Sequence, residues 1–108
     1  MTEATEDRAD ALFHALADRT RRDILRRTLG GEHSVTALAA KYEMTFAAVQ
    51  KHVAVLERAM LVTKERRGRE QIVHADPRML RSAARLLDAY EEIWRGRIDR
   101  IDRVLAGD

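Results

Sequence analysis

The chain has 108 residues, of which 45% are hydrophobic and 35% charged, with a formal net charge of +2. This length fits one domain, and the composition is that of a folded protein rather than a disordered one. The absence of cysteine excludes disulfides, thiolate metal sites and cysteine nucleophiles. Because we find neither a signal-peptide pattern nor an apolar run of about 18 residues, we expect a cytoplasmic protein with no membrane partner.

Two helices are predicted in the first third of the chain. The spacing of apolar residues predicts a helix over residues 5–16. Asp18 is a suitable N-cap for a second helix that runs to Leu29 and ends at Gly30–Gly31. We expect an inward stripe on the second helix, made of Ile24, Leu25 and Leu29.

Two more helices, joined by a tight turn, are predicted in the middle of the chain. Ser34 can cap a short helix from Val35 to Tyr42, and Thr45 can cap a longer one that reaches Ala59. Both have a stripe of apolar residues at helical spacing. The stripes are Val35, Leu38 and Ala39 in the shorter helix, and Ala48, Val49, Val53 and Leu56 in the longer one.

A β-hairpin and a long helix complete the predicted order. Residues 61–66 and 71–75 indicate two strands around the basic segment Arg67-Gly68-Arg69-Glu70. Asp76-Pro77 is a strong helix start, and we expect the helix to continue through Gly96. Its apolar residues follow a near-heptad spacing. They are Leu80, Ala84, Leu87, Tyr90, Trp94, Ile98, Ile101 and Leu105.

The predicted fold is mainly α with a small β-hairpin, in the order α-α-α-α-β-β-α. Two short helices joined by a tight turn and followed by a basic hairpin define a winged helix-turn-helix. We expect residues 1–108 to form one such domain, with dimerisation helices at both ends. A last helix of about 40 Å is longer than the rest of so small a domain, so its outer half needs a partner to bury it. The predicted dimer interface is Leu12, Phe13, Leu80, Ala84, Leu87, Tyr90, Trp94, Ile98 and Ile101.

The middle of the chain has the chemistry of a double-stranded DNA reader. Residues 45–70 carry six Lys or Arg against three Glu, and a recognition helix reads bases with its N-terminal residues. Gln50 can bond adenine and Lys51 guanine. The predicted DNA-binding residues are Thr36, Thr45, Phe46, Ala47, Gln50, Lys51 and His52 in the helices, and Lys64, Arg66, Arg67 and Arg69 in the hairpin.

A different function also fits the same basic surface. The chain could be a winged-helix module that docks on an acidic protein partner. The paired polar residues Gln50 and Lys51 and the basic hairpin tip favour DNA. For His52, a phosphate contact and a structural role remain equal alternatives.

Three segments resemble ArsR-type repressors, in the right order and spacing. They are residues 17–25 (ADRTRRDIL), 45–62 (TFAAVQKHVAVLERAMLV) and 66–70 (RRGRE). The resemblance implies a dimeric winged-helix repressor that binds a palindromic operator and releases it when an inducer arrives. The chain departs from the family at Arg19, where proline is usual, and at Met60, where glycine follows the recognition helix. Because positive φ is costly for methionine, we expect a differently built turn at Met60.

Neither a metal site nor a catalytic site is predicted. Metal-sensing members use cysteines, or His and carboxylate pairs on the last helix, whereas this chain has no cysteine and its last helix has no histidine. The four histidines, His14, His33, His52 and His74, occupy separate elements. With no catalytic motif either, we expect a regulator rather than an enzyme, with no cofactor.

Overall fold

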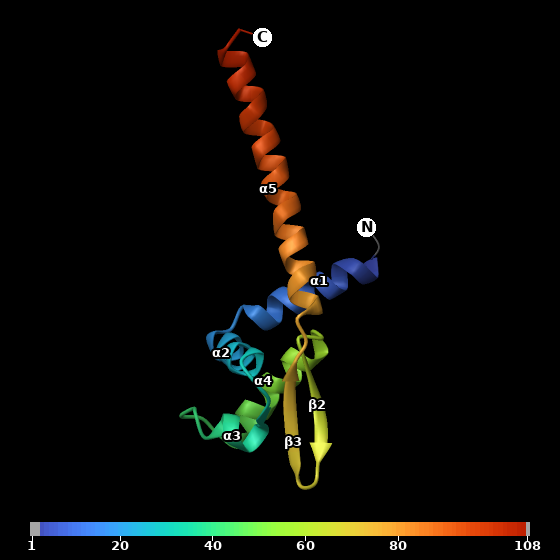
Figure 1. Cartoon of the computed structure of the whole chain (residues 1–108), viewed down its shortest axis with the longest axis vertical. Coiled ribbons are helices and arrows are strands. Elements are labelled where there is room, and N and C mark those ends of the chain that lie inside the picture. Colours follow the sequence, from blue (N-terminus) through green and yellow to red (C-terminus); the bar gives the residue numbers. More distant parts are fainter. Residues whose placement is uncertain (1–2, 108) are drawn as a thin grey trace.

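The computed structural model describes residues 3–107 and contains five helices and three strands in that range (Figure 1). The elements are α1 (Glu3–Leu16), α2 (Arg19–Leu29), β1 (His33–Ser34), α3 (Val35–Ala39), α4 (Phe46–Arg58), β2 (Val62–Arg67), β3 (Glu70–Ala75) and α5 (Arg78–Leu105). The mainly helical winged helix-turn-helix fold is therefore confirmed. The predicted order lacked β1, because a two-residue strand is too short to show an alternating pattern.

The first two helices lie close to their predicted positions. α1 begins two residues earlier than predicted, and the Asp18 side chain caps α2 by accepting the Arg21 backbone N–H at 3.0 Å. The stripe of α2 differs from the prediction, because Leu29 is 48% exposed and Thr28 is buried instead. The Thr28 hydroxyl donates to the Ile24 and Leu25 carbonyls at 3.0 Å, which allows this polar side chain to face the core.

The predicted caps of the helix-turn-helix are both present. The Ser34 and Thr45 side chains accept the backbone N–H groups of Ala37 and Ala48 at 3.0 and 3.1 Å. α3 ends at Ala39 rather than at Tyr42, because the next amides, starting with Lys41, bond to carbonyls three residues back and tighten the chain into a turn.

The turn after α4 contradicts the prediction. Met60 adopts φ 62°, so a methionine takes the left-handed conformation that usually belongs to glycine. Its N–H donates to the Glu57 carbonyl at 2.9 Å, and the N–H of Leu61 donates to the Leu56 carbonyl at 3.0 Å. These two bonds define a Schellman motif. The usual turn is therefore kept without glycine.

The wing is a three-stranded antiparallel sheet in the order β1-β3-β2. Arg67 pairs with Glu70, so the strands are longer than predicted and the loop shrinks to Gly68 and Arg69. Gly68 has φ 64°, which suits the first position of a two-residue hairpin turn of type II′. Ser34 of β1 pairs with Ile72, which joins the wing to the start of α3.

A single core lies between α1, α2, α3, α4 and the base of the wing. The largest fully buried side chains are Ile24, Leu38, Leu56, Leu61, Val49, Val53, Val62 and Val73. α5 contributes little to this core: Ala83 is its one buried residue, and Met79 and Leu80 are half-buried against it. Figure 1 shows the rest of α5 projecting away from the body, and the long axis of the molecule reaches 69 Å.

The start of α5 combines two local signals. Asp76 accepts the backbone N–H of Arg78 at 3.1 Å, and Pro77 precedes the first helical residue. The guanidinium and backbone N–H of Arg78 hold the pKa of Asp76 down at about 2. The helix then continues for 28 residues through Gly96, as predicted.

Candidate nucleic-acid interface

The N-terminal half of α4 presents a polar and small-residue face to solvent. Val49, Val53 and Leu56 are buried, which fixes the helix on the core. The exposed residues of the first turns are Phe46, Ala47, Gln50 and Lys51, preceded by the exposed cap Thr45. The start of a helix has unpaired backbone N–H groups and the positive end of the helix dipole, both of which favour a phosphate. This face could therefore lie against a nucleic acid.

His52, in contrast, faces the junction between α1 and α2. Its Nδ1 lies 3.4 Å from Arg21 Nη1 and 3.8 Å from Asp18 Oδ2. Arg21 also donates to the carbonyls of Ala15 and His14 at 2.9 and 2.8 Å. These contacts tie α4 to the end of α1. Of the two roles considered for His52, they favour the structural one.

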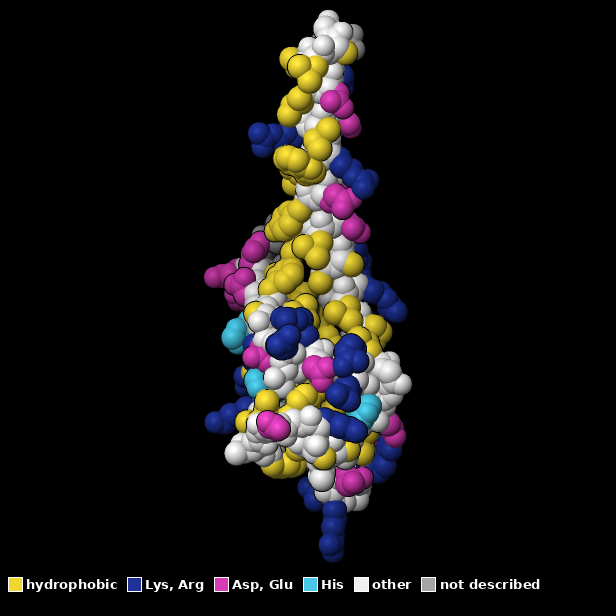
Figure 2. Space-filling model, turned by 90° about the vertical axis from the view of Figure 1, so that its left-hand side faces the viewer, with side chains coloured by type: hydrophobic (Ala, Val, Ile, Leu, Met, Phe, Trp, Pro, Cys, Tyr) yellow, Lys and Arg dark blue, Asp and Glu magenta, His cyan; other side chains and the backbone are white. Residues whose placement is uncertain are grey.

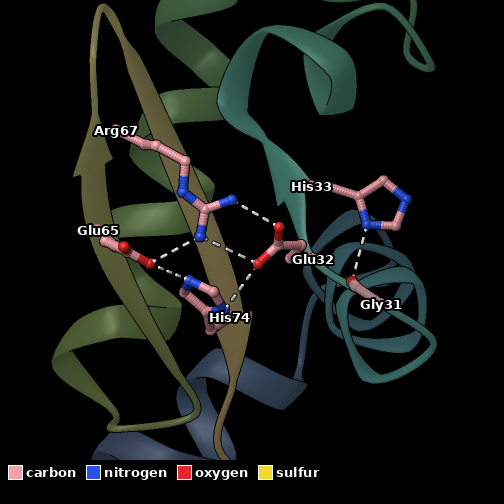
Figure 3. Close-up of polar contacts among 6 residues, drawn as sticks. All are labelled: Gly31, Glu32, His33, Glu65, Arg67 and His74. Carbon is pink, nitrogen blue, oxygen red and sulfur yellow. Dashed lines mark hydrogen bonds and ion pairs between the residues drawn. The ribbon is translucent and has the colours of Figure 1, made fainter.

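Arg67 belongs to a cluster of ionic side chains on one face of the wing (Figure 3). It donates to Glu32 at 2.7 Å and to Glu65 at 3.1 Å. His74 completes the cluster, with Nε2 at 2.8 Å from Glu65 and Nδ1 at 3.6 Å from Glu32. Arg67 lowers the pKa of Glu32, and His74 followed by Arg67 lowers that of Glu65. Since Glu32 precedes β1, this cluster fastens β2 to the body of the protein.

The other basic residues of the hairpin are less constrained. Lys64 and Arg66 share the second face of β2, because side chains alternate along a strand. Lys64 lies 3.4 Å from Glu57 of α4, so this face continues from the recognition helix. Arg66 Nε contacts only the Gly68 carbonyl, at 3.4 Å, and within residues 3–107 no acidic side chain pairs with Arg66 or Arg69. These two cations are free for phosphates.

A half-buried group of polar contacts positions the helix-turn-helix on α2. The Tyr42 hydroxyl donates to Asp23 Oδ2 at 2.5 Å, and Arg27 Nε donates to the same carboxylate at 2.8 Å, beside Arg26. Tyr42 and the two arginines depress the pKa of Asp23. Burial and the bond to Asp23 raise the pKa of Tyr42 to about 12.

The exposed apolar residues of α5 form a stripe along the projecting helix, visible in yellow in Figure 2. We call this set the α5 stripe; its large members are Leu87, Tyr90, Ile93, Trp94, Ile98, Ile101, Val104 and Leu105. Ile93, Val104 and Leu105 are not in the predicted interface: Ile93 and Val104 lie beside the heptad positions, and Leu105 is the last residue of the heptad series. Trp94 is 56% exposed, and Arg97 lies over its ring. So much apolar surface on one helix calls for a partner.

Other members of the predicted interface lie at or near the body. Leu12 is only 2% exposed and packs in the protomer's own core, so it does not present a free surface. Leu80 is half-buried against that core, whereas Phe13 and Ala84 are exposed. Leu12 lies at the spacing expected of an exposed stripe, and periodicity alone does not distinguish a core face from an interface face.

Several residues that shape this surface were absent from the predicted site, although Asp18 was predicted as a helix cap. They are Asp18 and Arg21 beside His52, Asp23 with Tyr42, and Glu32 beside Arg67. Their partners lie up to 35 residues away in the chain, so no local pattern signals them. Thr36, which was predicted to contact DNA, lies on α3 and is exposed.

Other kinds of site find no support in residues 3–107. Within that range no group of three or more His, Asp or Glu side chains has an arrangement that could hold a metal ion. No helix there has the length and apolar character that crossing a membrane requires.

Comparison with known proteins agrees with this geometry. Residues 16–65 match the family model described as a helix-turn-helix domain. The HTH-type transcriptional regulator Rv2034 of Mycobacterium tuberculosis is 35% identical over 81 residues, which are 75% of this chain and 76% of that protein. The uncharacterized HTH-type transcriptional regulator YuzN of Bacillus subtilis is 39% identical over 71 residues, covering 59% of this chain and 77% of YuzN.

A solved structure extends the similarity to the whole chain. The ArsR-like transcriptional regulator from Rhodococcus sp. RHA1 superposes with a TM-score of 0.87 at 29% sequence identity. The superposition covers 100% of this chain and 99% of the other. The fold, including the helix-turn-helix and the wing, is thus shared with a regulator of transcription. The chain belongs to the ArsR family of helix-turn-helix, DNA-binding transcriptional regulators.

Proposed function

We propose that the protein is a homodimeric repressor, acting in the cytoplasm, that binds a palindromic operator in double-stranded DNA and is released by a small-molecule inducer. The observation that carries the proposal is the division of α4. One face of the helix, with Val49, Val53 and Leu56, is buried in the core, while the opposite face of its first turns leaves Gln50 and Lys51 exposed. A recognition helix enters the major groove with its N-terminal residues in this way.

Each part of the surface has a role in this proposal. Gln50 bonds an adenine edge and Lys51 a guanine edge, while Thr36 and the start of α4 at Thr45 meet phosphates. The wing contacts the neighbouring backbone through the unpaired Arg66 and Arg69. Arg67 holds the wing in place, because its guanidinium is already occupied by two carboxylates.

The dimer forms through α1 and α5. The α5 stripe supplies the apolar area, and a groove of about 330 Å³ between α1 and α5 adds a concave surface lined by residues such as Ala9, Met79 and Leu86. Both helices lie away from the wing tip (Figure 1). A two-fold dimer then places two α4 helices about 34 Å apart, one turn of DNA. The whole chain acts as one domain.

A gel-shift titration with the DNA upstream of the protein's own gene tests the proposal. We expect a discrete complex that survives excess unrelated DNA. Gln50→Ala should lower the ratio of specific to non-specific affinity. Arg69→Ala should reduce the slope of log K against log salt by about 1, because one phosphate contact is lost. Arg103→Ala, which removes an arginine from the far end of α5, is the matched control and should leave the slope unchanged.

Two results would count against the proposal. Equal binding of the upstream DNA and unrelated DNA would contradict sequence-specific recognition. Binding that is specific but indifferent to both Gln50→Ala and Arg69→Ala would place the DNA on another surface.

A further inference from the structure

Phe46 stands out among the residues of the proposed DNA-reading face. It is the first residue of α4 and is 47% exposed. Among the described residues of that helix it is the one large apolar side chain left exposed, and it is not among the residues packed against the core. About half of its surface is therefore left in water, where it contributes no burial energy to the fold.

Helix geometry places the Phe46 ring ahead of the polar reading residues. Residues four apart lie on the same face, so Phe46 and Gln50 form one row and Ala47 and Lys51 the next. Side chains in a helix also lean toward its N-terminus. The ring of Phe46 therefore extends from the end of the helix that would enter the groove.

The chemistry of the major groove restricts what a phenyl ring can recognise there. Phenylalanine has no hydrogen-bonding group, so it cannot read the polar edges of adenine, guanine or cytosine. The C5 methyl group of thymine is the one apolar group that the four bases present in the major groove. We propose that Phe46 is a specificity-determining residue that selects thymine in each half-site by burying this methyl group. The inference rests on the proposed function, since it requires α4 to lie in the groove.

Replacing thymine by deoxyuridine tests the inference, because the two bases differ only in the C5 methyl group. The probe is the upstream fragment, prepared once with thymidine and once with deoxyuridine throughout. Burying one methyl contributes about fourfold in affinity, and two half-sites give about 15-fold. We expect wild-type protein to lose about that factor on deoxyuridine DNA. Phe46→Ala should bind thymidine DNA more weakly than the wild type by about the same factor. Its affinity for deoxyuridine DNA should be close to its affinity for thymidine DNA.

Leu29→Ala is the matched control, because Leu29 is equally exposed, at 48%, but lies on α2. It should respond to deoxyuridine as the wild type does, and circular dichroism should show all three proteins folded. Wild-type binding that ignores deoxyuridine, or an equal loss in wild type and Phe46→Ala, would overturn the inference alone. No binding of either DNA by the wild type would overturn the proposed function as well.

Discussion

The Met60 turn provides the most direct test of how the recognition helix is connected to the wing. A left-handed conformation costs an L-residue about 1–2 kcal/mol, because its Cβ approaches the following carbonyl oxygen. Met60 has φ 62° and two Schellman bonds at its turn hold it there. Met60 is 54% exposed, so replacing it by glycine would remove little packing energy. The relief of backbone strain should therefore be the larger effect.

Met60→Gly should therefore stabilise the protein. Glycine removes the steric cost but loses more backbone entropy on folding, by roughly 0.5–1 kcal/mol, so we expect a net gain of about 1 kcal/mol. For a domain of this size that gain corresponds to a rise in Tm of about 4–8 °C. Urea and thermal unfolding at one fixed protein concentration measure it, since dimerisation makes Tm depend on concentration.

Met60→Ala separates the backbone effect from the loss of the methionine side chain. Alanine retains the Cβ and hence the strain, so this variant should be no more stable than the wild type. A Met60→Gly protein that is less stable than Met60→Ala would refute the reasoning and show that the turn does not carry the cost assigned to it.

Three further predictions concern the polar contacts. Tyr42→Phe should lose about 1 kcal/mol at pH 7, because the bond to Asp23 disappears. The pKa of Tyr42 is about 12 in the folded protein and about 10 in the unfolded chain, so the neutral hydroxyl stabilises the fold. This contribution to the free energy of unfolding is complete below pH 10 and is lost as the pH rises toward 12. Urea unfolding at pH 7 and 11.5 should show the gap between wild type and Tyr42→Phe narrowing; a constant gap would argue against the shift. Arg67→Ala should weaken DNA binding without changing its salt slope, in contrast to Arg69→Ala, and anisotropy titrations that gave both the same slope change would contradict the positioning role of Arg67. Glu32→Gln and Arg67→Ala should lower the Tm by similar amounts, and the double variant by little more than either. A double variant that lost the sum of the two single losses would show that the two residues do not interact.

Most of the fold could be predicted from the sequence because its signals are local. The caps Asp18, Ser34 and Thr45 each accept an amide three residues on, and such spacing is readable in one dimension. The continuity of α5 through Gly96 also follows from local rules, since one glycine is a small cost in a long helix. The exposed face of α4 is the complement of its buried stripe, so the candidate site followed from the same periodicity.

The features that escaped prediction depend on tertiary contacts. β1 exists because two residues meet β3 from across the chain, and the role of Arg67 is decided by Glu32, 35 residues away. The burial of Leu12 depends on how α1 crosses the body. At Met60 the sequence correctly indicated a position that usually needs a positive φ. It did not predict that methionine would adopt this φ, which the hydrogen bonds of the Schellman motif stabilise.

Sedimentation velocity of wild type, Trp94→Glu and Trp94→Phe, alone and with the upstream DNA, tests the central claim most directly. Burial of an aromatic anchor such as Trp94 in an interface contributes on the order of 2–4 kcal/mol, so a charge there should separate the protomers. We predict that wild type and Trp94→Phe sediment at twice the 12.4 kDa chain mass and bind the DNA as one dimer, while Trp94→Glu is a folded monomer that no longer binds. A wild-type monomer at micromolar concentration, or a Trp94→Glu protein that remains dimeric, would contradict the account.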